Sequence, residues 1–386
     1  MKISIPKERR PGEARVAASP DTVKKFAALG LEVVVETGAG AGVSIADSVF
    51  AEAGAAIADD EAGALGDADI VLKVQRPLFG DGGEPDELSL MKQGCLLIGL
   101  LAPLANRADA DAYARQGVTA FAMELLPRIT RAQSMDALSS QSNLAGYRAV
   151  IDAAYEFGRA FPMMMTAAGT VAPARVVVFG AGVAGLQAIA TAKRLGAIVS
   201  AFDVRAAVKE QVESLGATFI EVAPEEGEEG ETAAGYAREM GEEYQRRQAK
   251  VIRETLEKQD IVICTALIPG RPAPVLITEE MVKGMKPGSV IVDLAVEAGG
   301  NCEGSEMGEV VKKHGVTIVG HANVPSRIAV DSSALYARNL LNFVTPLIDE
   351  ETKGLAIDWD DEIIKGALLT RDGKVVHGAP AGEGDG

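Results

Sequence analysis

Histidine and cysteine are scarce in this chain of 386 residues. The three histidines are His314, His321 and His377, so a catalytic site that depends on histidine has few candidates. The three cysteines are Cys95, Cys264 and Cys302. Their odd number and wide separation indicate buried thiols in a reducing compartment, and they give no metal-ligand spacing. We therefore expect no metal site.

Long apolar runs and positive charge are lacking as well. No apolar run reaches the length that spans a bilayer, and residues 1–6 predict a strand instead of a signal peptide. The chain has 38 basic and 55 acidic residues and a net charge of −17, which argues against nucleic acid and against unaided binding to anionic lipid. A content of 47% hydrophobic and 24% charged residues is typical of a soluble globular protein, and the length suffices for two domains.

The most informative stretch is residues 175–205. A β-branched and aromatic run at 176–179 predicts a buried parallel strand. Good helix formers follow at 186–195, and a second apolar strand at 197–202 ends on Asp203. Between the first strand and the helix lie three glycines with G-x-G-x-x-G spacing: Gly180, Gly182 and Gly185. The order of strand, glycines, helix, strand and acid predicts a dinucleotide site; the alternative, a glycine-rich turn without a ligand, is less favoured.

Each part of this motif has a mechanical reason. Gly180 permits the tight turn, Gly182 lets a pyrophosphate approach the backbone, and Gly185 lets the helix pack on the strand. The helix N-terminus, at Val183, offers unpaired N–H groups and a positive dipole end to phosphates. Asp203 has the spacing of a carboxylate that binds the adenosine ribose hydroxyls. Because a carboxylate repels a 2′-phosphate, we expect NAD(H) to be favoured over NADP(H), although the nearby Arg205 opposes this preference.

Alternating strand and helix patterns predict an α/β protein. We expect two Rossmann-like doubly wound parallel-sheet domains, separated by a cleft and joined by long helices. The first α/β domain, without a dinucleotide fingerprint, covers residues 1–135 plus 330–386. The NAD(H)-binding Rossmann domain, with a connecting helix, covers 136–329. The expected strands are 2–6, 32–36, 70–74, 95–100, 118–124, 176–179, 197–202, 218–222, 260–264, 289–294 and 316–319, with a hairpin at 368–376.

Four further segments carry predictions. The polar stretch 126–136 has two arginines and precedes a helix expected over 136–161, so it lies either at the mouth of the cleft or in an ordinary solvated linker. The acidic stretch 224–236 is expected to be a mobile surface loop, on which Gly235 and Tyr236 could close over a ligand. The loop 265–270, which includes Ala266 and Leu267, follows a strand at the edge where doubly wound sheets bind ligands. Met163 to Met165 are expected to fill the core.

The sequence resembles the NAD(H)-binding alpha component (domain I) of the proton-translocating nicotinamide nucleotide transhydrogenases, over nearly its whole length. These enzymes are related to alanine dehydrogenase. The loop with Arg128, Gln133 and Asp136 is a more specific match than the glycine motif. The matching segments are Pro6-Lys7-Glu8, Arg15-Val16-Ala17, 73–77, 128 with 133–136, 139–143, 180–185, 235–237, 265–270 and 292–295.

The resemblance implies residue roles. Arg128, Gln133, Asp136 and Ser139 are implied to hold the nicotinamide and its ribose. The other implied cofactor-binding residues are Gly180, Gly182, Val183, Gly185, Asp203, Val204, Arg205, Gly235, Tyr236, Ala266 and Leu267.

The resemblance also implies activity and partners. Hydride passes directly and Re/Si-specifically from NADH to NADP⁺ held on a separate component, and a membrane-embedded component couples this transfer to proton translocation. A homodimer, activity only with partner subunits, and a cytoplasmic location at the inner membrane through those subunits are implied as well. Direct transfer between two nicotinamides needs two carbons at reacting distance without water, and it needs no acid or base.

Two alternatives remain. An alanine dehydrogenase-like oxidoreductase has an arginine and a lysine matched here by Arg15 and Lys73, and an acid where this chain has Glu297. It also has a catalytic histidine near the position of Leu100 or Leu101, whereas residues 95–107 contain none. The imine chemistry of such an enzyme needs a proton acceptor, which weighs against it. The second alternative is a non-catalytic NAD(H)-sensing module that changes partner binding.

Overall fold

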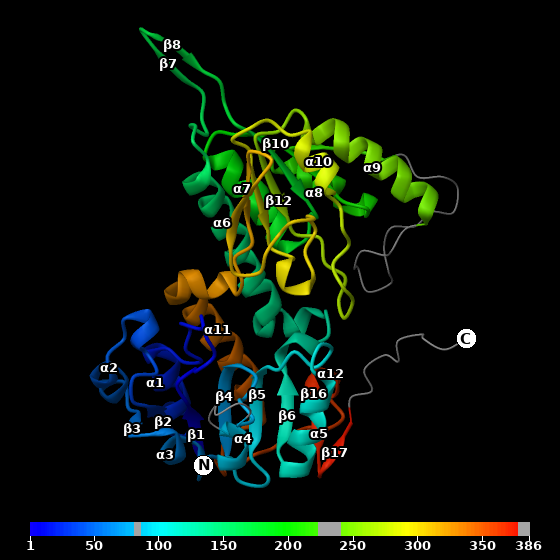
Figure 1. The fold of residues 1–386 in the computed structure, drawn as a ribbon. Coiled ribbons are helices and arrows are strands. Elements are labelled where there is room, and N and C mark those ends of the chain that lie inside the picture. Colours follow the sequence, from blue (N-terminus) through cyan, green and yellow to red (C-terminus); the bar gives the residue numbers. More distant parts are fainter. Residues whose placement is uncertain (81–85, 223–240, 377–386) are drawn as a thin grey trace. The chain divides into compact units, whose positions relative to one another are not determined.

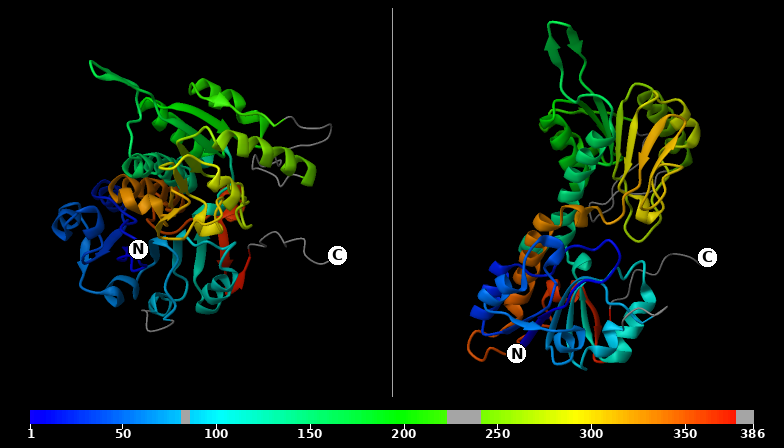
Figure 2. Two further views of the ribbon diagram at one scale, coloured as in Figure 1. Left: turned by 45° about the horizontal axis from the view of Figure 1, so that its top comes forward. Right: turned by 60° about the vertical axis from the view of Figure 1, so that its left-hand side comes forward.

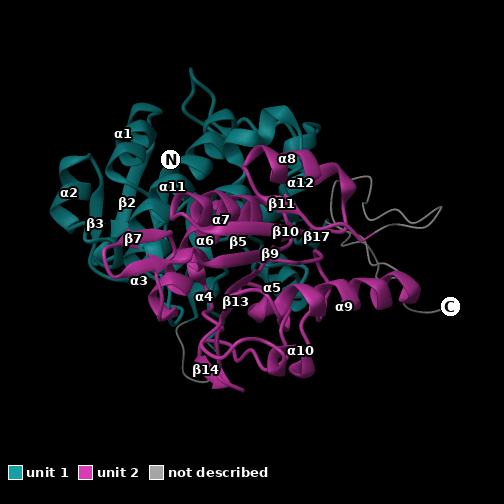
Figure 3. Cartoon of the chain, turned by 90° about the horizontal axis from the view of Figure 1, so that it is seen from above, with its two compact units in different colours: residues 1–141, 326–386 teal, residues 142–325 magenta. Residues whose placement is uncertain are grey.

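A computed structural model describes residues 1–80, 86–222 and 241–376 of the chain. It contains two compact units, each with its own sheet (Figure 1). Unit 1 comprises residues 1–141 and 326–386, and unit 2 comprises residues 142–325 (Figure 3). The helix α6 (Ala137–Glu156) begins in the first unit and ends in the second.

Unit 1 is a largely parallel sheet covered by helices. Among the described residues its strand order is β17-β16-β6-β5-β4-β1-β2-β3, and the strands from β6 to β3 are parallel. The hairpin of β16 and β17 extends the sheet in antiparallel fashion from β6. The strands are β1 (Lys2–Ile5), β2 (Glu32–Glu36), β3 (Ala56–Ala58), β4 (Ile70–Gln75), β5 (Leu96–Leu100), β6 (Thr119–Ala122), β16 (Leu368–Arg371) and β17 (Lys374–Val375).

The helices of unit 1 begin where the sequence offers caps. Ser19 and Thr22 form a capping box at the start of α1, with Pro20 at the first helical position. The longest helix that lies wholly in this unit, α11, is largely buried, and Tyr336, Leu340 and Phe343 on it are inaccessible. The helices are α1 (Pro20–Ala28), α2 (Asp47–Glu52), α3 (Glu61–Leu65), α4 (Glu87–Leu90), α5 (Arg107–Gln116), α11 (Ala329–Val344) and α12 (Glu362–Ala367), with 3₁₀ turns η1 (Ala41–Val43), η3 (Met123–Leu125), η4 (Thr130–Met135) and η8 (Thr345–Leu347).

Unit 2 has the strand order of a dinucleotide-binding fold. In the described residues the order is β11-β10-β9-β12-β13-β15-β14, and all neighbours are parallel except the edge strand β14. Counted from β9 along the chain and without β14, this is the order 3-2-1-4-5-6. The strands are β9 (Arg175–Phe179), β10 (Ile198–Phe202), β11 (Thr218–Phe219), β12 (Ile261–Cys264), β13 (Val290–Asp293), β14 (Val310–Lys313) and β15 (Val316–Val319).

Helices on both faces complete unit 2, so the predicted α/β fold with two Rossmann-like, mainly parallel sheets is confirmed. The helices are α7 (Val183–Arg194), α8 (Lys209–Ser214), α9 (Glu242–Leu256) and α10 (Glu279–Lys283), with 3₁₀ turns η5 (Ala206–Val208) and η6 (Val296–Ala298); η7 (Val324–Ile328) crosses the boundary between the units. No described helix combines the length and the apolar character that a membrane span requires.

The prediction that Met163 to Met165 fill the core is wrong. They lie at the start of a hairpin of β7 (Met164–Thr166) and β8 (Gly169–Val171), and the three methionines are 60%, 42% and 79% exposed. This hairpin extends away from the sheet of its own unit (Figure 1, Figure 2). The reason is local. The helix α6 ends at Glu156 instead of residue 161, and the buried rings of Phe157 and Phe161 occupy the core position.

Candidate functional site

The turn between β9 and α7 contains two glycines that packing requires. Gly180 has a φ of 92°, and a Cβ there would lie 2.7 Å from Oγ1 of Thr265. A Cβ on Gly185 would lie 1.8 Å from the carbonyl oxygen of Gly180, which is closer than atoms can approach. These glycines therefore hold strand, turn and helix together, whether or not a ligand is present.

Gly182 is different, because nothing in the described residues explains its missing side chain. Its φ is an ordinary −76°, and a Cβ there would meet no atom within 4 Å. It is also the N-cap of α7, where the described residues supply no side-chain cap and no acidic residue in the first turn. A helix N-terminus of this kind presents N–H groups and a positive dipole end beside open space, which fits a pyrophosphate.

Asp203 follows β10 and is tied to the glycine turn. Its Oδ2 accepts a hydrogen bond from the backbone N–H of Ala181 at 2.7 Å. Arg205 donates to the same carboxylate through its backbone N–H and Nε, each 2.9 Å from Oδ1, and through Nη2, 2.8 Å from Oδ2. Asp203 is only 8% exposed, and Val204 is partly buried beside it. The fold thus brings the predicted acid next to the predicted phosphate turn.

The loop after β12 meets the same turn. The hydroxyl of Thr265 lies 2.9 Å from the carbonyl oxygen of Gly180 and donates to it. Ala266 is held on both sides by Asn301, whose Oδ1 accepts from the Ala266 N–H at 3.0 Å and whose Nδ2 donates to its carbonyl at 2.9 Å. The neighbouring Leu267 is 47% exposed. Ala266 is therefore fixed next to the turn, while Leu267 presents an apolar side chain.

Asp293 and Asn301 are positioning residues that the sequence motifs did not reveal. The inaccessible carboxylate of Asp293 accepts hydrogen bonds from the N–H groups of Ala295, Asn301 and Cys302 and from the hydroxyl of Ser305. The signal was an aspartate at the C-terminal end of a predicted strand. Burial raises the pKa of the Cys302 thiol to about 12 and raises that of Cys264 well above its usual range, so neither thiol is poised to react.

In unit 1, the 3₁₀ turn η4 carries the loop predicted to face the nicotinamide. Ala132 is buried and anchors the turn, whereas Arg128 and Gln133 are exposed. Asp136 precedes α6, where its Oδ1 accepts from the backbone N–H of Ser139 at 2.8 Å and its Oδ2 from the Ser139 hydroxyl at 2.5 Å. Asp136 and Ser139 are therefore brought together as a helix cap.

Two cationic side chains elsewhere in unit 1 already have carboxylate partners. Arg15 donates to Glu13 at 2.7–2.9 Å and to Oε1 of Gln141 at 2.8 Å. Nζ of Lys73 lies 2.7 Å from Glu87 and 3.4 Å from Glu8. Burial raises the pKa of Glu13, but the hydrogen bonds and charge of Arg15 outweigh burial and lower it to about 2. Although burial lowers the pKa of Lys73, the charges of Glu8 and Glu87 raise it, so the lysine stays charged.

Gly235 and Tyr236, the predicted lid residues, lie outside the described residues. In the portion of the chain that the structure describes, no group of three or more His, Cys, Asp or Glu side chains forms a metal site. The histidine His314 pairs with Glu279 at 2.9 Å on the surface of unit 2, away from the glycine turn in the sequence.

Fold and site together define the class of two-domain Rossmann-like proteins. Comparison with known proteins then identifies the family. Residues 4–145 match the N-terminal domain and residues 149–378 the C-terminal domain of the family described as alanine dehydrogenase/PNT. The chain belongs to this family.

Three relatives show where in the family it falls. It is 64% identical over 384 residues to an NAD(P) transhydrogenase alpha subunit of Rhodospirillum rubrum, with all of both chains covered. The crystal structure of the transhydrogenase from Sinorhizobium meliloti superposes with a TM-score of 0.87 at 54% identity, covering 97% of this chain and 100% of that one. Alanine dehydrogenase of Mycolicibacterium smegmatis is 32% identical, with 99% and 96% covered.

Proposed function

We propose that the chain is the NAD(H)-binding component of a proton-translocating transhydrogenase. In this role it takes part in Re/Si-specific hydride transfer between NADH and NADP⁺ bound on a partner component. Its near full-length similarity to transhydrogenase alpha subunits, at 64% and 48% identity, supports this assignment over the more distant alanine dehydrogenases.

The observation that carries the NAD(H) proposal is the open space at Gly182, next to the N-terminus of α7 and the carboxylate of Asp203. Packing explains Gly180 and Gly185, but only a ligand that approaches the backbone explains Gly182. The residues proposed to bind the adenosine and pyrophosphate portions are Gly180, Gly182, Val183, Gly185, Asp203, Val204, Arg205, Gly235, Tyr236, Ala266 and Leu267.

For the nicotinamide end we propose Arg128, Gln133, Asp136 and Ser139. When bound, the nucleotide supplies the hydride. Arg128 and Gln133 are exposed and able to contact a ligand, while the bonds between Asp136 and Ser139 keep the start of α6 in place. The protein's task is to orient the ring and exclude water, because hydride transfer between two nicotinamides requires no proton donor from the chain.

The runner-up, amino-acid oxidation, is disfavoured by charge pairing in unit 1. Arg15 and Lys73 match two cationic residues of alanine dehydrogenase. Both of them are paired here with carboxylates of the chain itself, Glu13 for the first and Glu8 and Glu87 for the second. A substrate carboxylate would have to displace these partners at a cost in desolvation. The sensor alternative makes one distinct prediction, which is NAD(H) binding without hydride exchange.

We further propose that the chain works as a homodimer, held at the inner membrane from the cytoplasmic side by its NADP(H)-binding and membrane-embedded partners. The β7–β8 hairpin gives the dimer a candidate contact. A hairpin of two short strands is marginally stable alone, yet both of these strands are exposed. Residues 160–174 carry no charge although the whole chain carries −17, so pairing with a second copy is not opposed by repulsion at this surface.

The decisive experiment is a comparison of NADH and NADPH binding to the isolated chain by nucleotide fluorescence, followed by hydride exchange with an added NADP(H)-binding component. We expect selective NADH binding, and exchange only with the partner present. Binding without exchange would favour the sensor, and NAD⁺ reduction driven by alanine alone would favour the dehydrogenase.

A further inference from the structure

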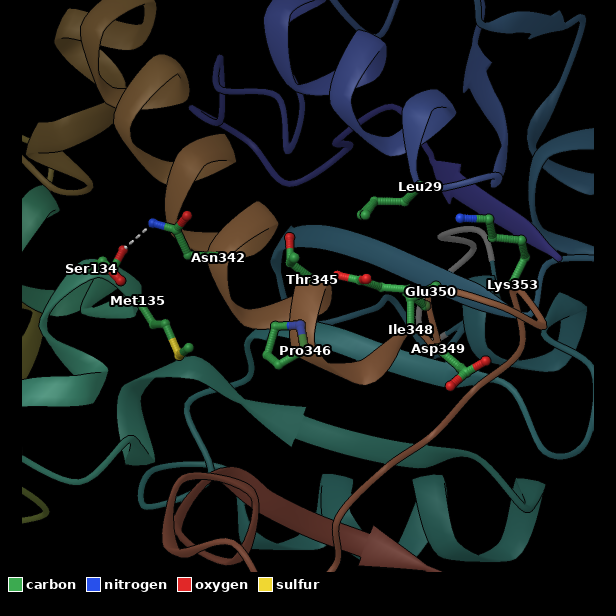
Figure 4. A pocket seen from close by; sticks show the side chains of 10 residues that line it. All are labelled: Leu29, Ser134, Met135, Asn342, Thr345, Pro346, Ile348, Asp349, Glu350 and Lys353. Carbon is green, nitrogen blue, oxygen red and sulfur yellow. Dashed lines mark hydrogen bonds between the residues drawn. The ribbon is translucent and has the colours of Figure 1, made fainter.

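Two asparagines on α11 bond to the same backbone atom of the loop η4. Nδ2 of Asn339 and Nδ2 of Asn342 each lie 2.9 Å from the carbonyl oxygen of Ser134 and donate to it. The two side chains are three residues apart and therefore share one face of the helix. Figure 4 shows Asn342 directed at Ser134 from the neighbouring helix. Together they use both lone pairs of this carbonyl.

Asn339 also reaches the other end of the loop. It is 8% exposed, and its Oδ1 accepts a hydrogen bond from the hydroxyl of Ser140 at 2.7 Å. Ser140 lies in the first turn of α6, whose cap is Asp136. One buried amide thus connects the end of η4 with the start of α6, and it does so on both sides of Asp136.

The helix that carries the asparagines is itself anchored. Tyr336 is inaccessible, and its hydroxyl donates to the carbonyl oxygen of Lys73 on β4 at 2.7 Å. Leu340 and Phe343 are inaccessible in the core of unit 1. The asparagines therefore extend from a rigid support, which is what residues that position a neighbouring loop require.

Packing cannot do this work, because a hollow of about 390 Å³ lies beside the loop. Figure 4 shows its lining residues: Leu29, Ser134, Met135, Asn342, Thr345, Pro346, Ile348, Asp349, Glu350 and Lys353. On this side Ser134 has open space instead of a packed core. Directed hydrogen bonds then decide where the loop sits.

We propose that Asn339 and Asn342 are positioning residues that set the loop carrying Gln133 and Asp136 for hydride transfer. They act through the Ser134 carbonyl and do not contact the nucleotide. The catalytic consequence rests on the proposed function, whereas the restraint on the loop follows from the contacts alone. Small displacements of groups that orient a substrate reduce the rate of reaction far more than they reduce binding.

The test uses Asn339→Leu, Asn342→Leu and the double variant, because leucine keeps the branched shape and removes the donor. Arg338→Ala, an exposed change on the same helix, is the matched control. Asn342→Gln restores an amide donor at the half-exposed position. Amide hydrogen exchange over residues 130–136 is measured without nucleotide. NADH affinity and single-turnover hydride transfer are then measured with the NADP(H)-binding component.

In the double variant we expect exchange in the loop to be at least about tenfold faster, and hydride transfer at least about tenfold slower, with NADH affinity changed by less than about threefold. The control is expected to match the parent, and Asn342→Gln to recover most of the loss of Asn342→Leu. Unchanged exchange, or equal losses in transfer and affinity, would overturn the positioning role. If the double variant fails to fold, the single variants decide by the same criteria. If the parent itself transfers no hydride, the proposed function fails, while the exchange data still decide whether the asparagines restrain the loop.

Discussion

Gly180 and Gly185 approach so closely that a Cβ on Gly185 would lie 1.8 Å from the carbonyl oxygen of Gly180. Two residues from Gly180, at Gly182, the same added atom would meet nothing within 4 Å. Glycines of a single motif thus have separable roles, one in packing and one beside open space. This difference can be tested by matched substitutions.

We expect Gly185→Ala to lower the free energy of unfolding by about 3 kcal/mol or to prevent folding, because the added methyl has no room. Gly182→Ala should change stability by no more than about 1 kcal/mol. It should weaken NADH binding at least about tenfold, since the methyl enters the space proposed for the pyrophosphate. Urea unfolding and fluorescence titration measure the two effects. A Gly182→Ala variant that binds NADH as tightly as the parent would show that the turn does not bind the pyrophosphate.

The carboxylate of Asp203 should determine the choice between NADH and NADPH. Asp203→Ser removes the charge that repels a 2′-phosphate and releases Arg205 from this partner. We expect the affinity for NADPH relative to NADH to rise at least about tenfold. Titration with both nucleotides measures the ratio. The double change with Arg205→Ala is the control, because it should lose most of the gain, and an unchanged ratio in Asp203→Ser would contradict the assignment.

Replacing Arg15 with leucine should change how stability depends on pH. Because the pKa of Glu13 is lowered to about 2 in the folded chain, Glu13 stabilises the fold above its unfolded pKa, and this stabilisation is lost as the pH falls toward 2. A shift of this size corresponds to roughly 3 kcal/mol. The loss in Arg15→Leu should therefore be largest near pH 7 and shrink toward pH 3. Chemical unfolding across this range measures it, with Arg131→Leu, at an exposed ion pair, as the control.

Gln133→Asn should slow hydride transfer far more than it weakens NADH binding. The change keeps the amide and shortens the side chain by one methylene, so it alters the position of the contact without removing it. We expect a loss of at least about tenfold in the single-turnover rate, with affinity within about threefold. Stopped-flow transfer and equilibrium binding give the two numbers, and parallel losses in both would exclude an orienting role.

Changing two exposed methionines should weaken the proposed homodimer. Met163→Ser with Met165→Ser removes apolar surface from the β7–β8 hairpin without touching the core of unit 2. Sedimentation at several concentrations should show a larger dissociation constant, with thermal stability of the dilute protein unchanged. A parent chain that remains monomeric at all concentrations would remove the homodimer from the proposal.

Local patterns in the sequence were enough for the architecture of both sheets. Apolar runs at 176–179 and 197–202, separated by glycines and a helical pattern, specify a strand, a turn, a helix and a strand, because period and turn chemistry act over neighbouring residues. Ser19 with Pro20 likewise marked the start of α1. The same patterns misplaced Met163 to Met165, because apolar character alone does not show which residues the core has room for.

The sequence by itself determined the fold class, the glycine turn and the acid that follows β10, because each depends on spacing along a few consecutive residues. Only the tertiary structure decided which groups these residues meet. It showed the space at Gly182, the bond from Ala181 to Asp203 and the two asparagines on Ser134, where the partners lie 22 and more than 200 residues apart. Such contacts follow from the packing of distant elements, and no local periodicity encodes them.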